Sequence, residues 1–240
     1  MTALLELKDI TKRFMGLVAL DHINLTVNQH DIIGLIGPNG AGKTTLFSVI
    51  SGYLKPEEGE IYYKGERITG KPTHEICHKG ICRTFQIVKP FSEMNVLENV
   101  MVGAFHHTSS VKLAKEKAMS VLEFCGLTEK AGLLGKELTI ENKKRLEVAR
   151  ALATDPDLLL LDEVMAGLNP VEVHQAVDFI YKIHEKGYTL LVIEHVMEVI
   201  MPISDRVVVL DYGKKIADCD PEEAVKKPEV INAYFGSTEE

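Results

Sequence analysis

The most informative part of the sequence is Gly37-Pro38-Asn39-Gly40-Ala41-Gly42-Lys43-Thr44. It matches the pattern G-x-x-x-x-G-K-[ST] at every fixed position. A nearly continuous apolar run at 31–36 precedes it, and residues 43–51 have the composition of a helix. A buried strand, a glycine-rich loop and a helix, in this order, form the setting that the pattern requires. The stretch therefore predicts a phosphate-binding loop rather than a glycine-rich turn that binds nothing.

The residue types of this loop suit a phosphate ligand. Glycines let successive backbone N–H groups turn toward phosphate oxygens, and the start of the following helix adds a partial positive charge. Lys43 is expected to reach the β- and γ-phosphates, and Thr44 to offer its hydroxyl to Mg²⁺. The candidate nucleotide-binding residues are Gly37, Pro38, Asn39, Gly40, Ala41, Gly42, Lys43, Thr44 and Thr45.

A second run, four leucines at 158–161 followed by Asp162 and Glu163, supplies the acidic half of such a site. A buried strand would deliver Asp162 to its carboxyl end, where the carboxylate can hold a magnesium ion through its water shell. Glu163 comes next and can orient or deprotonate an attacking water. A carboxylate pair that merely caps a strand is the alternative, and the phosphate loop in the same chain argues against it.

The rest of the chain alternates between strand and helix patterns. Residues 5–10 and 23–27 alternate apolar and polar side chains, as half-buried antiparallel strands do. From about 91 to 153 the pattern is helical, and buried strands then alternate with helices, which predicts an α/β protein with a parallel sheet. The other expected elements are short strands at 61–68, helices at 111–125, 140–153 and 170–186, strands at 158–161 and 189–193, a last strand at 206–210, and a short helical tail.

Composition and charge limit the function classes. The 240 residues are 45% hydrophobic and 26% charged, which is typical of a globular protein with a sizeable core. The net charge of −8 lacks the basic excess of a DNA- or RNA-binding protein, so no nucleic-acid partner is expected. No apolar run approaches the about 20 residues of a membrane-spanning helix, and no signal peptide is visible. A cytoplasmic protein is expected.

The cysteines suggest reduced thiols rather than a disulfide framework. Cys77 and Cys82 lie close in sequence to His74 and His78, so a metal site is an alternative to consider. Their spacing matches no standard zinc pattern, and no metal is expected there. The four cysteines are Cys77, Cys82, Cys125 and Cys219.

Two further residues extend the motifs over nearly the whole chain. Gln86 stands at the entry to the helical region, and His195 follows a buried strand. With the phosphate loop, Asp162 and Glu163 in this order, the sequence resembles an ABC ATPase. The resemblance implies that Gln86 contacts Mg²⁺ and a membrane partner, that His195 contacts the γ-phosphate, and that Phe14 lies against adenine. A phenylalanine that only fills the core or a strand face is the alternative for Phe14.

The resemblance also implies the fold class: an α/β P-loop NTPase with a RecA-like parallel sheet, an N-terminal antiparallel β subdomain and an inserted helical subdomain. A single ABC ATPase domain would fill residues 1–240. Its nucleotide-binding core is expected at about 1–87 and 154–240, and its helical subdomain at about 88–153. The implied catalytic residues are Lys43, Glu163 and His195, the metal ligands Thr44, Gln86 and Asp162, and the cofactors ATP and Mg²⁺.

A narrower likeness concerns the ATP-binding subunits of branched-chain amino acid importers. It implies a cytoplasmic subunit on the inner face of the plasma membrane, with a second ABC ATPase subunit, integral membrane permease subunits and, indirectly, an external solute-binding protein as partners. Whether the ATPase pair is a homodimer or a heterodimer stays open. The segments that carry the likeness are Arg83-Thr84-Phe85-Gln86, Val96-Leu97-Glu98-Asn99-Val100, Ala166-Gly167-Leu168-Asn169-Pro170 and Ala233-Tyr234-Phe235-Gly236.

The sequence departs from the family at the signature segment, the Leu-Ser-Gly-Gly-Gln stretch with which one ABC ATPase covers its partner's ATP. Here it reads Leu138-Thr139-Ile140-Glu141-Asn142. Thr139 keeps a hydroxyl and is the expected contact in trans, but Ile140 and Glu141 replace both glycines. A carboxylate about 4 Å from a phosphate costs on the order of 4 kcal/mol at an effective dielectric of about 20. We therefore expect a signature segment that is weakened but not lost. The other reading, in which Thr139 caps the helix and Glu141 lies in its favourable first turn, is compatible with this one.

Two other functions stay open. An ATP-binding regulatory or structural subunit with little turnover would explain the altered signature segment, although Lys43, Glu163 and His195 are intact. A soluble ABC ATPase that acts on ribosomes or DNA would usually carry two cassettes or a long coiled coil, and the sequence has one cassette and no sustained heptads. The leading prediction is an ATP-hydrolysing subunit of a membrane transporter.

Overall fold

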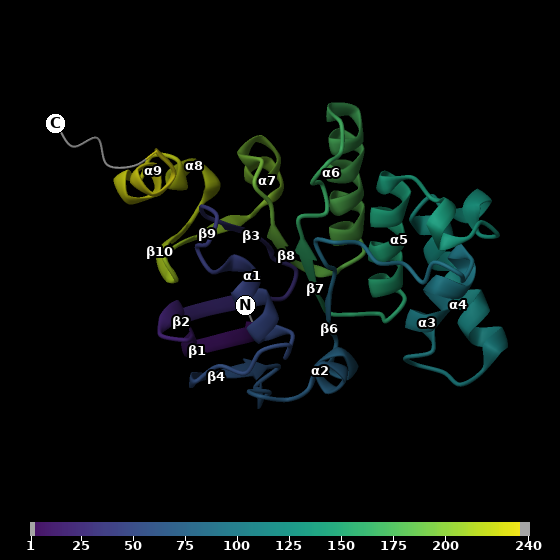
Figure 1. Cartoon of the computed structure of the whole chain (residues 1–240), viewed down its shortest axis with the longest axis horizontal. Coiled ribbons are helices and arrows are strands. Elements are labelled where there is room, and N and C mark those ends of the chain that lie inside the picture. The colour runs from purple at the N-terminus through teal and green to yellow at the C-terminus, as the bar shows by residue number, and fades with distance from the viewer. Residues whose placement is uncertain (1–2, 236–240) are drawn as a thin grey trace.

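The apolar runs of the sequence become a six-stranded sheet in the computed structural model, which describes residues 3–235 (Figure 1). All neighbouring strands are parallel except the pair at one edge, β10 and β9. Every residue of β3, β8 and β7 is buried, as expected for a sheet that is covered on both faces. In order across the sheet, the strands are β10 (Lys214–Cys219), β9 (Arg206–Asp211), β3 (Ile32–Ile36), β8 (Thr189–Ile193), β7 (Leu158–Asp162) and β6 (Ile81–Arg83).

A four-stranded antiparallel sheet forms a second layer below the parallel sheet in Figure 1. Its long strands mix buried and exposed positions, which matches the period-two pattern of the sequence. Helix α1 (Lys43–Ile50) belongs to the core that joins the two sheets, and its Leu46 and Phe47 are fully buried there. In sheet order, the antiparallel strands are β2 (Leu17–Asn28), β1 (Ala3–Phe14), β4 (Glu58–Tyr63) and β5 (Glu66–Arg67).

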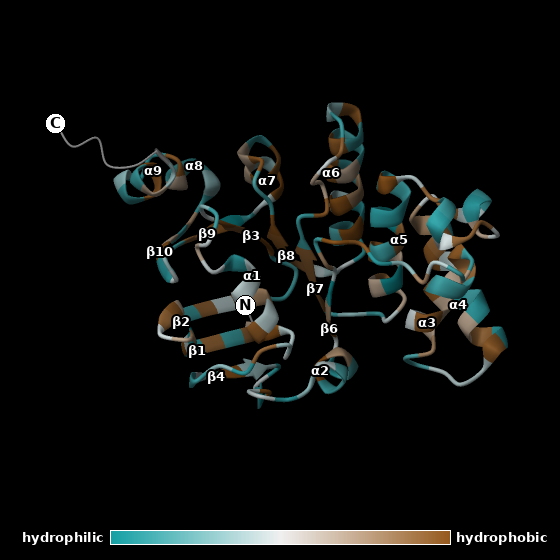
Figure 2. Ribbon diagram, in the orientation of Figure 1, coloured by the Kyte–Doolittle hydropathy of each residue, from teal (hydrophilic) through white to brown (hydrophobic). Residues whose placement is uncertain are grey.

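Helices cover the opposite face of the parallel sheet (Figure 1). Apolar residues of these helices and of the strands form one continuous core. Figure 2 shows the result: the central strands β3, β8 and β7 are hydrophobic, while the helices around them carry hydrophilic residues as well. The covering helices are α6 (Pro170–Glu185), α7 (Met197–Ile203), α8 (Pro221–Ala224) and α9 (Pro228–Phe235), while the short α2 (Thr73–Lys79) precedes β6.

Between β6 and β7 the chain leaves the sheet and forms a group of helices at one end of the molecule (Figure 1). Asn95 begins the first of them with a capping box, in which its side chain accepts from the Glu98 N–H and Glu98 accepts from the Asn95 N–H, both at 2.8 Å. The group contains α3 (Val96–Ala104), α4 (Val111–Phe124), α5 (Ile140–Leu152) and the short 3₁₀ turns at Thr128–Lys130 and Gly135–Glu137.

The prediction of an α/β fold with a parallel sheet and an antiparallel β part is confirmed, and the helices expected at 111–125, 140–153 and 170–186 end within one residue of those found. The prediction that the strand at 206–210 is the last one is wrong, because β10 follows it. This edge strand was missed because its mixed polar sequence has no apolar run, and only Ala217 is buried. Strand β6 was missed because it has three residues. Gly236, in the last segment of the narrower family likeness, lies outside the described residues.

Candidate active site

The phosphate loop connects β3 to α1, as predicted. Gly37 and Gly42 have positive φ angles of 145° and 105°. A Cβ atom at Gly37 would lie 2.1 Å from the carbonyl oxygen of Leu210, and one at Gly42 would lie 2.5 Å from that of Ala19. The neighbouring backbone therefore excludes any side chain at these two positions, which explains why the loop needs glycine there.

The Lys43 side chain lies inside this loop. Its ammonium group donates to the carbonyl oxygens of Gly37, at 2.6 Å, and Pro38, at 2.9 Å. Burial lowers the pKa of Lys43, while the negative charges of Glu163 and Asp162 oppose that shift. The loop thus holds a buried cation, as an anion-binding site of this type requires, and the carboxylates of Glu163 and Asp162 are close enough to influence its charge.

A pocket of about 400 Å³ opens over the loop. It brings together side chains that are far apart in sequence: Phe14 at the end of β1, Glu163 after β7 and His195 after β8. Phe14 is 42% exposed, so it does not fill the core, and the alternative of a strand-face phenylalanine stays open. The pocket is completed by Leu17, Val18, Ala19, Asn39, Gly40, Ala41, Gly42, Lys43, Thr44, Thr45 and Tyr212.

Every polar group of Glu163, in its side chain and its backbone, has a polar contact. Gln86 Nε2 donates to its Oε2 at 2.5 Å, and His195 Nε2 lies 2.6 Å from its Oε1. Its backbone has a positive φ of 49°, and its N–H donates to the Ile193 carbonyl at 3.0 Å. The buried ammonium of Lys144 donates to the Glu163 carbonyl at 3.1 Å. The strained backbone and these four contacts fix the carboxylate at the pocket wall.

Asp162 is 1% exposed and makes an ion pair that the sequence did not predict. Its Oδ2 accepts from Arg83 Nη2 at 2.7 Å, and its N–H donates to Thr84 Oγ1 at 3.0 Å. Burial raises the pKa of Asp162, while Arg83 opposes the shift. Within residues 3–235, the buried Oδ1 has no hydrogen-bond partner. Asp162 therefore keeps one acceptor oxygen free.

Thr139 begins α5 and lies outside the pocket that this chain forms over its own phosphate loop. Its Oγ1 accepts from the backbone N–H of Asn142 at 3.3 Å and from the Asn142 side-chain amide at 2.8 Å. The reading of Thr139 as a helix cap is therefore confirmed. The Ile140 side chain beside it is 65% exposed. Such an exposed apolar residue at a helix start is open to contact with another chain.

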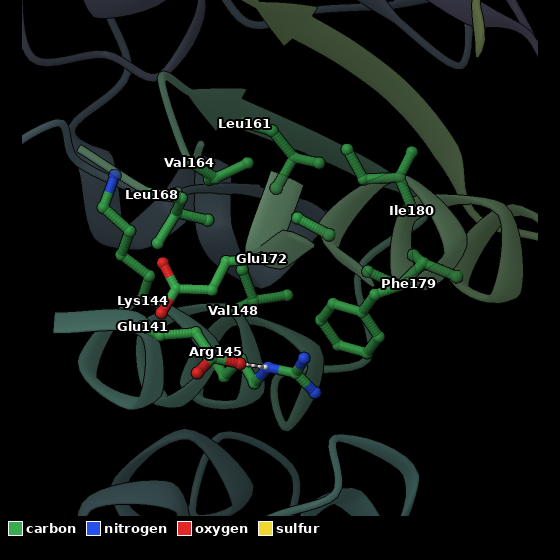
Figure 3. A pocket seen from close by; sticks show the side chains of 12 residues that line it. Glu141, Lys144, Arg145, Val148, Leu161, Val164, Leu168, Glu172, Phe179 and Ile180 are labelled. Atoms are coloured by element: carbon green, nitrogen blue, oxygen red, sulfur yellow. Dashed lines mark ion pairs between the residues drawn. The ribbon is translucent and has the colours of Figure 1, made fainter. Parts of the chain in front are cut away.

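The Glu141 carboxylate is paired within its own helix. It lies 3.0 Å from Arg145 Nε, the contact drawn in Figure 3. Arg145 Nη2 in turn donates to Gln175 Oε1 at 3.2 Å. The guanidinium carbon of Arg145 lies 6.0 Å from the ring centre of Phe179 on α6. Figure 3 shows Glu141, Arg145 and Phe179 among the side chains that line a small cavity, of about 30 Å³, between α5 and α6. Arg145 therefore offsets part of the charge that Glu141 brings to the signature segment.

The alternative of a metal site near Cys77 gains no support from the structure. Within residues 3–235, no group of three or more His, Cys, Asp or Glu side chains could hold a metal ion. His78 instead stacks on His106, with the ring centres 4.2 Å apart. Among the same residues, no helix combines the length and the apolar character that crossing a membrane would take.

Several residues near the site were missed from the sequence. Leu17, Val18 and Tyr212 line the pocket with exposed side chains, and their only signal was an apolar or aromatic residue beside a turn. Arg83 was quoted only for its family likeness. Lys144 gave no signal, because a lysine in a helix reads as a solvated residue until packing buries it.

Comparison with known proteins agrees with this geometry. The profile of the ABC transporter family matches residues 20–166. The branched-chain amino acid transport ATP-binding protein BraF of Pseudomonas aeruginosa is 41% identical, and LivG of Escherichia coli is 38% identical; each match covers 97% of this chain and 98% of the relative. MJ1267, an ATP-binding cassette solved in its ADP conformation, superposes with a TM-score of 0.89 at 33% identity over 99% of this chain and 100% of that one. The dimeric cassette MJ0796, bound to ADP and Pi, gives 0.81 at 25% identity over 90% and 98%. The phosphate loop, the fixed Glu163 carboxylate and these full-length matches show that the chain belongs to the ABC transporter family, as one of its ATP-binding subunits.

Proposed function

We propose that this chain hydrolyses ATP to power the import of branched-chain amino acids through membrane permease partners. The observation that carries the hydrolytic role is the position of the Glu163 carboxylate, which is held by Gln86 and His195 at the pocket over the phosphate loop. A carboxylate fixed on both oxygens beside a phosphate site suits a base that orients or deprotonates water. Because these contacts already hold the Glu163 carboxylate in place, it needs little reorganisation during the reaction.

The other site residues then have complementary roles. Lys43 would neutralise the β- and γ-phosphates, and the His195 imidazole would donate a hydrogen bond to the γ-phosphate. Phe14, at the mouth of the pocket, offers a ring face to adenine. The proposed nucleotide contacts within the chain are Phe14, Gly37, Pro38, Asn39, Gly40, Ala41, Gly42, Lys43, Thr44 and Thr45.

The residues present also fit a magnesium ion. Asp162 Oδ1 is buried and has no hydrogen-bond partner within residues 3–235, and Thr44 lines the same groove as Asp162. Carboxylate, hydroxyl and amide oxygens are the hard donors that Mg²⁺ prefers. We propose Thr44, Asp162 and Gln86 as its holders. When bound, the ion would supply positive charge that offsets the negative charge of the phosphates.

The proposed cargo follows from the relatives, since BraF and LivG are named for high-affinity branched-chain amino acid transport. A groove of about 910 Å³ offers a surface for a permease. Phe85, Ile87, Val102 and Phe105 expose apolar side chains along it, next to Gln86. Docking here would hold the chain on the inner face of the plasma membrane, with an external solute-binding protein acting indirectly through the permeases.

We also propose that the chain pairs with a second ABC ATPase subunit when ATP is bound. The similar cassette MJ0796 is described as a dimer. The exposed start of α5 would place Thr139 against a nucleotide on the partner, while Ile140 and Glu141 would weaken that contact. Because the signature segment of this chain would bind ATP weakly, we favour a partner that has a stronger signature segment. A homodimer is the alternative.

The test of hydrolysis is Glu163→Gln, which keeps the shape of the side chain and removes the base. We expect ATP turnover to fall by about 10²–10⁴-fold, while ATP binding stays close to that of the wild type. Glu129→Gln changes an exposed glutamate of the 3₁₀ turn at Thr128–Lys130, which does not line the pocket over the loop, and serves as the matched control. Equal turnover in both variants would contradict the role of Glu163. A wild-type complex without turnover would instead indicate a regulatory subunit.

The test of transport is co-expression of this chain with the permease subunits of a branched-chain amino acid importer. We expect the chain in the membrane fraction and uptake of labelled leucine that depends on Lys43. A chain that never enters the membrane fraction would contradict the proposed permease partners and favour a soluble ABC ATPase.

A further inference from the structure

The four residues 83–86, which connect β6 to the helical group, each contact the acidic residues around the site. Arg83 pairs with the Asp162 side chain at 2.7 Å, and the Thr84 hydroxyl accepts from the Asp162 N–H. The Phe85 N–H donates to a Glu147 carboxylate oxygen, and Gln86 donates to Glu163. The roles proposed above for Asp162 and Gln86 do not explain why Arg83 pairs with Asp162.

Arg83 is fixed much more firmly than an arginine that only neutralises a charge. Its side chain is 7% exposed. Nη1 donates to Ser48 Oγ on α1 at 2.9 Å, and the guanidinium carbon lies 5.7 Å and 5.2 Å from the ring centres of Phe47 and Phe85. A planar guanidinium that donates on one edge and packs on aromatic rings loses little freedom when it pairs with a carboxylate. The partner carboxylate is therefore held in one orientation.

By fixing the orientation of the Asp162 carboxylate, Arg83 also determines where its second oxygen lies. Oδ2 is used by Arg83, and Oδ1 stays buried without a partner among the described residues. Thr44 and Asp162 line the same groove, and Thr44 also lines the pocket over the phosphate loop. Asp162, whose Oδ1 is free, thus lines the groove in which the proposed magnesium ion would meet Thr44.

We propose that Arg83 is a positioning residue for Asp162: it anchors Oδ2 so that Oδ1 stays available to the divalent cation that accompanies the nucleotide. This inference rests on the proposed magnesium site. Because Ser48 and the two phenylalanine rings hold the guanidinium in place, it orients the carboxylate rather than taking the place of the cation. Groups that orient metal ligands in this way typically change metal affinity by about 10–100-fold when they are removed.

The experiment measures the binding of ADP, which is not hydrolysed, by calorimetry in Mg²⁺ and in EDTA. The gain in affinity that Mg²⁺ gives is the quantity of interest. For Arg83→Met we expect this gain to fall by about tenfold, with ADP affinity in EDTA within about twofold of the wild type. In the background of Asp162→Asn, the same substitution should cause no further loss, because the residue that it positions is already changed. A purely structural role for Arg83 would lower both affinities in both backgrounds.

Matched variants keep the result interpretable. Arg67→Met removes an exposed arginine that pairs with Glu60 at 2.8 Å on the antiparallel sheet, and it should leave the Mg²⁺ gain unchanged. If Arg83→Met does not fold, Arg83→Lys and Phe85→Leu replace it, and each should reduce the gain in the same direction. An unchanged or larger gain in the Arg83 variants would overturn the proposal, as would an equal loss in the Asp162→Asn background.

Failure of the inference can be told apart from failure of the proposed function. Turnover by the wild-type protein tests the ATPase, and it stands whatever the Arg83 variants do. A wild-type protein that binds ADP with no gain from Mg²⁺ would overturn the magnesium site and the role of Arg83 with it, while Glu163→Gln would still test hydrolysis.

Discussion

Glu194, next to His195, should make the protein less stable as the pH rises through neutrality. Its side chain is 3% exposed, and its Oε1 accepts from the Met165 N–H at 2.9 Å. Burial raises the pKa of Glu194 from 4.5 to about 7, against the effect of that hydrogen bond and of the Lys144 charge. The perturbation is Glu194→Gln, which keeps the acceptor for Met165 and removes the titrating carboxyl.

The magnitude follows from the difference between the folded and unfolded pKa values. Between pH 4.5 and about 7, the folded protein holds a proton on Glu194 that the unfolded chain has lost. The free energy of unfolding therefore decreases with rising pH by about 1.36 kcal/mol per pH unit in this window, and it levels off above about pH 7. From pH about 5.5 to about 8, this one group should cost about 2 kcal/mol, and Glu194→Gln should abolish that cost.

The assay is urea unfolding of both proteins at several pH values across this range. The stability of Glu194→Gln relative to the wild type should improve by about 2 kcal/mol from the acidic to the basic end. Other titrating groups, such as Glu147, are common to both proteins and cancel in the difference. A stability difference that does not change with pH would show that Glu194 does not hold its proton more tightly in the folded protein than in the unfolded chain. Glu129→Gln, at an exposed site, should follow the wild-type profile throughout.

Three further predictions concern the nucleotide site. Lys43→Ala removes the cation inside the loop, and ATP affinity measured by equilibrium binding should drop at least about tenfold, whereas an unchanged affinity would place the phosphates elsewhere. His195→Ala should lower ATP turnover by about 10²-fold with ATP binding nearly unchanged, and parallel losses of both would contradict a role at the γ-phosphate. The double variant Ile140→Gly, Glu141→Gly should raise ATP-driven dimerisation in a Glu163→Gln background, as measured by light scattering; an unchanged dimer affinity would show that the signature segment is not weakened.

The sequence predicted the parts of the site that depend on local order. The loop at 37–44 follows directly from its glycines, and Asp162 and Glu163 follow from the apolar run before them. The ion pair between Arg83 and Asp162 could not be predicted in this way, because it joins residues that are 79 positions apart. It depends on the parallel pairing of β6 with β7, and three strand residues give no usable periodicity.

The ion pair of Glu141 with Arg145 is a second contact that the sequence did not predict. The sequence correctly placed Glu141 in the first turn of a helix, but it counted the carboxylate as fully repulsive toward a phosphate. The pairing with Arg145 depends on a side-chain orientation that Phe179 and Gln175 of α6 stabilise, so only the packed structure reveals it. An ion pair with this exposure adds at most about 1 kcal/mol, so part of the repulsion should remain.

Helix α5 joins the signature segment to Glu163, the proposed hydrolytic carboxylate. Its Lys144 donates to the Glu163 carbonyl, and its Glu147 accepts from the Phe85 N–H, while Thr139 at its start is open to a partner. A shift of α5 by one residue's rise, about 1.5 Å, would lengthen either hydrogen bond beyond the usual limit. These two hydrogen bonds connect α5 to Glu163 and to the segment 83–86. A partner that fixes the start of α5 must therefore also favour one arrangement of the Glu163 carboxylate. Dimerisation and hydrolysis are therefore expected to depend on each other through this helix, without any contact between the partner and Glu163 itself.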